Sequence, residues 1–181
     1  MKYRRDFLKL GSAGLLGLVL ACGAFGGVLG AAVTKAVATR IGVGLAYIAG
    51  AFAFTAPLAL VPLAPVPIAG HIGGHGAHGA SLTVIAMLFG AEFLSGFGVM
   101  MMDISIGSIF ASVIPDAVRS RVGGAFAAIN YGTRPLGALL GGVLGATAGL
   151  RPALWVAVIG GVAGAALLVP SPLPRFRLPE N

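Results

Sequence analysis

The sequence predicts an all-α protein, folded as a polytopic membrane bundle of about five transmembrane helices. Hydrophobic residues make up 57% of its 181 residues, charged residues make up only 9%, and the mean hydropathy is +0.99. Soluble domains carry about 25% charged residues, so this chain has too few charges to cover a water-soluble body of its size. These features exclude a soluble enzyme, a disulfide scaffold and a disordered tail, and they favour a lipid bilayer as the solvent.

Five membrane spans are expected, because the few charged residues stand between long apolar runs. The spans lie at about residues 11–34, 43–64, 82–113, 122–149 and 153–169. About 20 apolar residues, rising about 1.5 Å each, cross the hydrocarbon core as a helix. We expect residues 1–181 to form a single membrane domain.

Proline and glycine separate the expected spans. A proline-rich stretch and the Gly/His-rich run that follows it predict a loop at 65–81. The third span should stop before Pro115, because the residue before a proline is pushed away from helical dihedrals. A short break at 149–152 leads into the last span, and residues 170–181 form a basic tail interrupted by prolines.

The basic residues lie mainly in the expected connections. On one side of the membrane we expect Lys35, Arg40, Arg119, Arg121, Arg175 and Arg177. Arg151 and the basic N-terminal arm would lie on the other side. Apart from the arm, this distribution follows the positive-inside rule for membrane proteins. The basic residues do not cluster into a stripe of the kind that binds the phosphates of nucleic acid. We therefore expect the bilayer, and no nucleic acid, as a partner despite the net charge of +7.

Glycine is abundant and recurs at a spacing of four residues within the spans. The repeated positions are Gly26, Gly30, Gly137, Gly141, Gly145, Gly149, Gly160 and Gly164. Small residues on one helical face let two helix backbones approach closely, which drives packing in lipid. The pattern therefore predicts close helix–helix contacts along these faces.

Three motifs occur in order along the chain, preceded by a short basic loop. The first, P-D-x-x-R-x-R, comprises Pro115, Asp116, Arg119 and Arg121. The second, G-x-x-P-L-G-x-x-x-G-G, comprises Gly132, Pro135, Leu136, Gly137, Gly141 and Gly142. The third is Gly149-Leu150-Arg151, and the basic loop contains Arg40 and Gly42. This ordered set resembles the C-terminal half of major facilitator superfamily (MFS) transporters, especially the bacterial exporter-like branch.

The resemblance covers roughly residues 11 to 178 and implies a partial MFS fold. The five spans look like helices eight to twelve of a twelve-helix carrier. The implied function is proton-coupled export of a small molecule by a multi-pass protein of the bacterial plasma membrane. The implied partners are a second helical half or a second copy of the chain. The acidic residue of the family's basic-loop motif is missing beside Arg40, so no gating role is expected there.

Three charged residues within the expected spans are candidates for coupling or substrate contact. Glu92 and Asp103 lie eleven residues apart, about three helical turns, and should share a face. A charged side chain at mid-bilayer costs roughly 2.5 to 3.5 kcal/mol, so such residues usually face a bundle interior or a water-filled path. Arg134 is either a counter-ion to one of them or a side chain that extends to the interface. The alternative for both carboxyl groups is a paired or neutral structural role.

Two other interpretations of the sequence stay open. The chain could be a non-transporting membrane protein, or a split or truncated half of a carrier. It could also be a protein that is exported or lipid-anchored through the twin-arginine-like segment from Arg4 to Cys22. His71, His75 and His78 could approach a metal, but their glycine-rich surroundings favour a connector. We expect no cofactor, no metal and no enzymatic activity, because neither a nucleotide-binding loop nor a catalytic triad pattern occurs.

Overall fold

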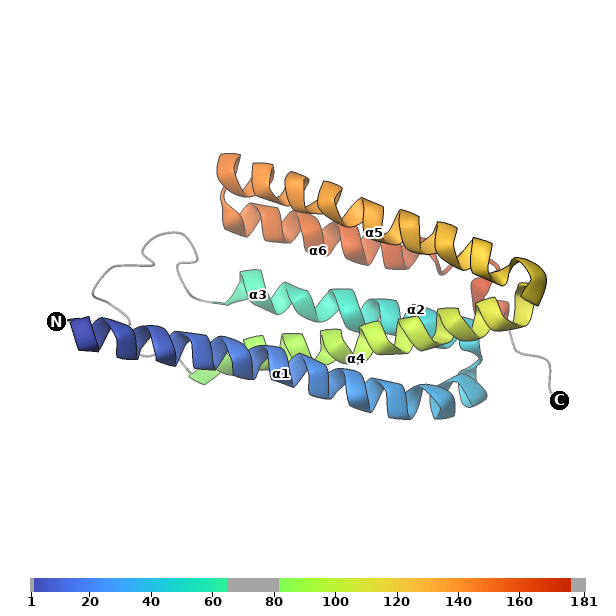
Figure 1. The fold of residues 1–181 in the computed structure, drawn as a ribbon, viewed down its shortest axis with the longest axis horizontal. Coiled ribbons are helices and arrows are strands. Elements are labelled where there is room, and N and C mark those ends of the chain that lie inside the picture. The colour runs from blue at the N-terminus through green and yellow to red at the C-terminus, as the bar shows by residue number, and fades with distance from the viewer. Residues whose placement is uncertain (1, 65–81, 177–181) are drawn as a thin grey trace.

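The structure is a computed structural model that describes residues 2–64 and 82–176 (Figure 1). These residues form helices joined by short turns, with no strand among them, which confirms the all-α prediction. The α-helices are α1 (Lys2–Ile41), α2 (Val43–Thr55), α3 (Leu60–Leu63), α4 (Leu82–Val113), α5 (Asp116–Thr147) and α6 (Leu150–Leu167). Two short 3₁₀ helices are η1 (Ala56–Ala59) and η2 (Leu173–Arg175).

Four helical segments within the described residues are long and apolar enough to cross a membrane. They are Gly17–Ile41, Val43–Leu63, Leu82–Val113 and Leu150–Leu167. The remaining expected span, 122–149, is helical almost throughout because it lies mostly in α5, but α5 is not among these four. Its interruption by polar and charged residues, including Arg134, makes it the least apolar of the long helices.

The ends of the helices agree with the expected boundaries in some places and differ in others. α4 ends at Val113, as the proline at 115 predicts. α1 continues past residue 34 to Ile41 and ends only at Gly42, whose φ of 94° favours glycine. α5 begins at Asp116, before the expected start at 122, directly after Pro115, whose φ of −56° and ψ of 144° make it the non-helical residue that precedes the first turn.

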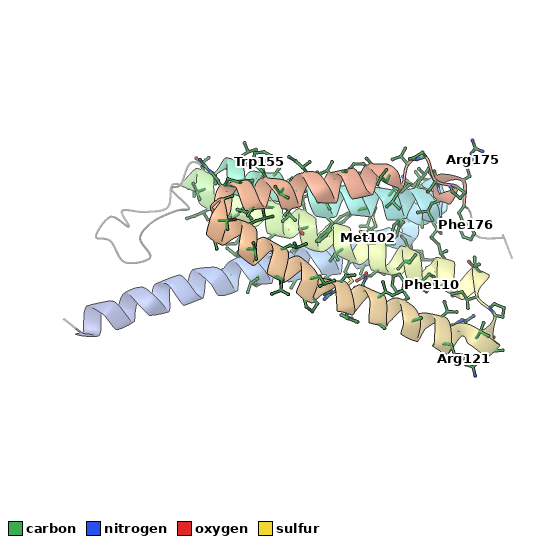
Figure 2. All side chains as sticks on the ribbon, turned by 90° about the horizontal axis from the view of Figure 1, so that it is seen from above. Met102, Phe110, Arg121, Trp155, Arg175 and Phe176 are labelled. Atoms are coloured by element: carbon green, nitrogen blue, oxygen red, sulfur yellow. The ribbon has the colours of Figure 1, made fainter. Side chains whose placement is uncertain are left out.

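The turn between α4 and α5 is fixed by the side chain of Arg119. Its guanidinium forms an ion pair with Asp116 at 2.7 Å, at the start of α5. The same group donates hydrogen bonds to the carbonyl oxygens of Ala111 (3.1 Å) and Ile114 (3.3 Å) at the end of α4. Phe110, labelled in Figure 2, adds an edge-on aromatic contact with Phe126, with ring centroids 5.0 Å apart. The P-D-x-x-R motif therefore closes a helical hairpin.

The closest packing lies where α4 runs between α1 and α2 (Figure 1). Gly26 of α1 lies against the backbone of Phe93, so that a β-carbon at residue 26 would collide with the Phe93 carbonyl group. Gly30 lies in the same way against Phe97, at 2.5 Å from a β-carbon to the carbonyl oxygen. Gly98 of α4 lies equally close to the backbone of α2. The glycine spacing in α1 thus predicted a close helix contact correctly.

The last two helices lie to one side of this packed group, with α6 next to α2 and α5 beyond it (Figure 1). α5 packs mainly on α6 and contains no buried residue. The predicted packing of its glycine face is not found within the described residues. No other atom lies within 4 Å of a β-carbon built at Gly137, Gly141 or Gly145. The same is true of Gly160 and Gly164 in α6.

One end of the bundle carries a group of basic residues. Arg40 ends α1, Arg119 and Arg121 lie just after the α4–α5 turn, and Arg175 lies in η2. Figure 2 shows Arg121 and Arg175 at this same end. The tail is held there by a hydrogen bond from the Gly44 N–H to the Phe176 carbonyl (3.4 Å).

At the opposite end of the bundle, Arg151 links α6 to α3. Its guanidinium donates a hydrogen bond to the Ala64 carbonyl oxygen at 2.7 Å, which joins the start of α6 to the end of α3. α1 also begins at this end (Figure 1), and its first turns hold Lys2, Arg4, Arg5 and Lys9. Apart from this N-terminal arm, the described basic residues are distributed as expected from the sequence, with Arg151 alone at this end.

Candidate functional site

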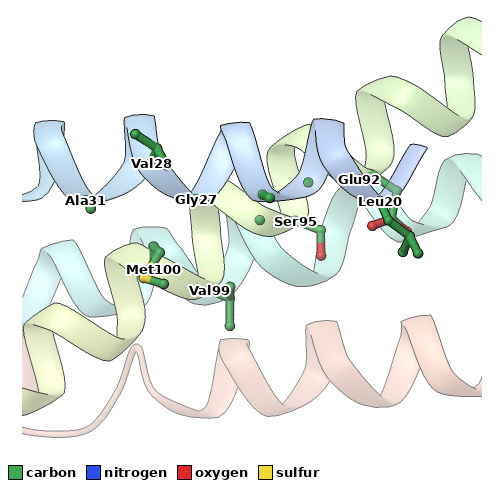
Figure 3. Close-up of a pocket in the computed structure, with 11 residues that line it drawn as sticks. Leu20, Gly27, Val28, Ala31, Glu92, Ser95, Val99 and Met100 are labelled. Carbon is green, nitrogen blue, oxygen red and sulfur yellow. The ribbon is translucent and has the colours of Figure 1, made fainter. Parts of the chain in front are cut away.

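A cavity of about 550 Å³ lies between α1 and α4 (Figure 3). Its walls are formed by small and apolar residues of the two helices and by two polar side chains. The apolar and small residues are Leu20, Gly23, Ala24, Gly27, Val28, Ala31, Gly96, Val99 and Met100. The polar side chains are those of Glu92 and Ser95. The cavity is therefore mostly apolar, and among the described residues that line it Glu92 supplies the one ionisable side chain.

Glu92 lies at one end of this cavity, near Leu20 (Figure 3). Its side chain is half-buried, because it lies across Gly23 of α1. A β-carbon at residue 23 would lie 3.2 Å from the Glu92 carboxyl oxygen Oε2. The absence of a side chain on Gly23 thus leaves the room that the carboxyl group occupies.

Ser95 is the second polar group of the cavity and is buried. Nothing in the sequence alone marked Ser95 as a candidate, since a serine in an apolar helix is common. Its position three residues after Glu92 could have indicated that the two side chains line the same space, because residues three apart on a helix are neighbours on one face.

Asp103 lies outside the residues that line the cavity. Its side chain is exposed. Glu92 and Asp103 do lie on the same long helix, as expected, but they do not share one cavity. Of the two candidate carboxyl groups, Glu92 is the one that lines this cavity.

Arg134 makes its contacts within α5. Its guanidinium lies 4.7 Å from the centre of the Tyr131 ring and 3.4 Å from the side-chain oxygen of Asn130. Among the side chains that the structure describes, those of residues 14, 17–64 and 82–176, there is a single ion pair, that of Arg119 with Asp116. Arg134 is therefore not paired with Glu92 or Asp103 in this conformation.

The motif residues divide into two groups. Pro115, Asp116 and Arg119 build the α4–α5 turn, as described above. Gly132, Pro135, Gly137, Gly141 and Gly142 all lie on α5, where their surroundings are open. Pro135 is accommodated inside the helix, which continues without a break. The second group therefore has no structural role among the described residues.

Two further predictions concern the N-terminal segment and the histidines. Cys22 lies within the continuous helix α1, and its thiol contacts the Phe89 carbonyl oxygen of α4 at 3.7 Å. His71, His75 and His78 lie outside the described residues. Within the part of the chain that the structure describes, no group of three His, Cys, Asp or Glu side chains could hold a metal ion.

Comparison of the chain with protein-family models, with curated proteins and with solved structures found no match. The similarity to MFS transporters therefore rests on the ordered motifs in the sequence.

Proposed function

We propose that this bundle is part of a secondary carrier, similar to the C-terminal half of an MFS transporter, that exports a small molecule in exchange for protons. The observation that carries the proposal is the carboxyl group of Glu92 inside the cavity between α1 and α4. The ordered motifs from Pro115 to Arg151 support the family resemblance. The localisation proposed with it is the bacterial plasma membrane.

The chemistry of the cavity suits proton coupling. An ionised carboxylate within the bilayer costs roughly 2.5 to 3.5 kcal/mol, so it gains from a proton or from a cationic ligand. Competition between the two at Glu92 would link movement of the ligand to movement of a proton. In carriers of this kind, one helical bundle rocks against another around a site near the bilayer midplane.

The proposal is tested by replacing the carboxyl group of Glu92. Ethidium is a suitable probe, because it is an apolar cation matched to an apolar cavity with one acidic group. In proteoliposomes containing the full chain, a pH gradient should drive ethidium movement. Glu92→Gln should abolish that movement, since the amide neither binds nor releases the proton. Glu92→Asp, the matched control, keeps the carboxyl group and should retain part of the activity.

Two results would count against the proposal. Unchanged proton dependence in Glu92→Gln would remove Glu92 from the coupling step. Absence of movement for ethidium, and for a panel of neutral and anionic probes, in the unaltered chain would contradict transport by this chain on its own and would favour the second candidate function below.

A second candidate function is that of a non-transporting membrane protein, or of a half that acts only after assembly. The open surroundings of α5 favour it, because the helix contains no buried residue. Co-reconstitution with a separate six- or seven-helix bundle distinguishes the two possibilities. Activity that appears only in the mixture supports a split carrier.

A further inference from the structure

Ser95 supplies a buried hydroxyl group to the cavity between α1 and α4 (Figure 3). The residue is only 8% exposed, and its hydroxyl group forms no hydrogen bond with the residues that the structure describes. Thr34, Thr55 and Ser108 differ from it, because each donates to a carbonyl oxygen four residues earlier in its own helix. Buried polar groups in proteins normally have a partner, so the Ser95 hydroxyl group points to an occupant of the cavity with a polar group of its own.

Ser95 and Glu92 lie one helical turn apart on α4 and both line the cavity. Residues three apart on a helix have Cβ atoms about 5 to 6 Å apart. A hydrogen bond from an N–H group to an oxygen spans about 2.7 to 3.2 Å, so one nitrogen between the two side chains can reach an oxygen of each. A carboxylate accepts hydrogen bonds only, and a hydroxyl oxygen also accepts them. The pair therefore suits a cationic nitrogen that carries at least two N–H donors.

The rest of the cavity is apolar and extends away from this pair. In Figure 3, Glu92 lies at one end of the cavity, and Val28, Ala31 and Met100 lie toward the other. The volume of about 550 Å³ is within the range of about 300 to 1,000 Å³ found for pockets that hold small molecules. A matching ligand therefore has a charged nitrogen at the end of an apolar body.

We propose that the cavity binds an apolar primary or secondary ammonium ion, whose charge is neutralised by the Glu92 carboxylate and whose second N–H donates to the Ser95 hydroxyl oxygen. The inference rests on the proposed function of this cavity and deepens it by naming the ligand class. A quaternary ammonium ion carries the same charge but has no N–H group, so it leaves the Ser95 hydroxyl unpaired. A site built around a hydrogen bond discriminates against an analogue that lacks the donor. Ser95 thus selects among cations.

The test compares two probes that have the same apolar body and the same charge at neutral pH. They are naphthylmethylammonium and naphthylmethyl-trimethylammonium. Binding to the detergent-solubilised full chain is measured by equilibrium dialysis, with empty micelles as the blank, so no transport is needed. The variants are Ser95→Ala and Glu92→Gln. The matched control is Ser105→Ala, because Ser105 is a buried serine of the same helix that does not line the cavity.

The unaltered chain should bind the ammonium probe about tenfold or more tightly than the trimethylammonium probe. Ser95→Ala should weaken the ammonium probe about three- to tenfold, which is the effect of losing one hydrogen bond. It should leave the trimethylammonium probe unchanged, which also shows that the cavity is intact. Ser105→Ala should change neither affinity. Glu92→Gln should weaken both probes, because it removes the charge that both of them need.

Three outcomes would overturn the inference. The first is equal binding of the two probes to the unaltered chain. The second is an unchanged affinity for the ammonium probe in Ser95→Ala. The third is an equal loss of both probes in Ser95→Ala, which would give Ser95 a role in packing only.

Failure of the inference is distinguishable from failure of the proposed function. If Glu92→Gln weakens both probes and Ser95→Ala changes neither, the cation site at Glu92 stands and the selection by Ser95 is wrong. If the probes bind with the expected preference but a pH gradient drives no movement, the inference stands and transport by this chain is contradicted.

Discussion

Glu92 owes its position to a glycine on the neighbouring helix. The eleven-residue interval between Glu92 and Asp103 was enough to predict a shared face of one helix. It was not enough to predict which of them lies in a cavity, because that depends on how α1 crosses α4. Gly23, which leaves room for the Glu92 side chain, is one of 30 glycines, and nothing in the sequence distinguishes it from the others.

Buried hydroxyl groups give a test of the packing at single residues. Thr34 and Ser105 are both about 1% exposed, but only Thr34 has a hydrogen-bond acceptor, the Gly30 carbonyl oxygen at 2.6 Å. The Ser105 hydroxyl has no partner among the described residues. An unsatisfied buried polar group costs about 1 to 3 kcal/mol. Ser105→Ala should therefore stabilise the bundle, by about 1 kcal/mol, in unfolding experiments in mixed detergent micelles.

Thr34→Val is the comparison for that experiment. It keeps the shape of the side chain but removes a hydroxyl that is bonded, so it should be neutral or lower the free energy of unfolding by up to about 1 kcal/mol. A clear loss of stability in Ser105→Ala would show that its hydroxyl has an acceptor and would contradict the packing described for α4.

At the scale of the elements, the contact of α1 with α4 is the most constrained. Gly26→Ala would place a methyl group against the Phe93 carbonyl, and overpacking of this kind costs about 1 to 3 kcal/mol. Gly160→Ala, on α6, meets no atom within 4 Å. It should be neutral or stabilise by about 0.5 to 1 kcal/mol, because alanine favours a helix over glycine. The unfolding midpoints in detergent should therefore shift in opposite directions.

Equal effects of these two substitutions would contradict the assigned contact between α1 and α4. A loss of stability in Gly160→Ala alone would instead place a neighbour against α6 that the described residues do not supply.

The elements also show how far the sequence predicts this fold. The length and hydropathy of the apolar runs were enough to predict every long helix, and Pro115 was enough to predict the end of α4. Both kinds of prediction succeed because they depend on the residues of one segment and not on its neighbours in the fold. The start of α5 was placed six residues late, since Arg119 and Arg121 were assigned to the connection before the span, whereas Arg119 pairs with Asp116 in the first turn of the helix. Whether a glycine row has a neighbour depends on the tertiary arrangement, so it was predicted correctly for Gly26 and Gly30 but not for Gly141.

At the scale of the whole molecule, the surface is that of a protein in lipid. Four apolar helical segments cross the length of the bundle, and most of their surface is not buried inside it. Arg121 of the α4–α5 hairpin and Arg175 of the tail lie at the same end of the bundle (Figure 2). In water such a surface would expose apolar area far beyond that of an ordinary soluble monomer.

Extraction of membranes therefore tests most directly whether the chain crosses the lipid bilayer. Membranes from bacteria that produce the full chain are washed with alkaline carbonate and then treated with detergent. Helices that cross the bilayer resist the alkaline wash, so the chain should stay with the lipid and be released only by detergent. Recovery of the chain as a stable monomer in the detergent-free supernatant would contradict the account.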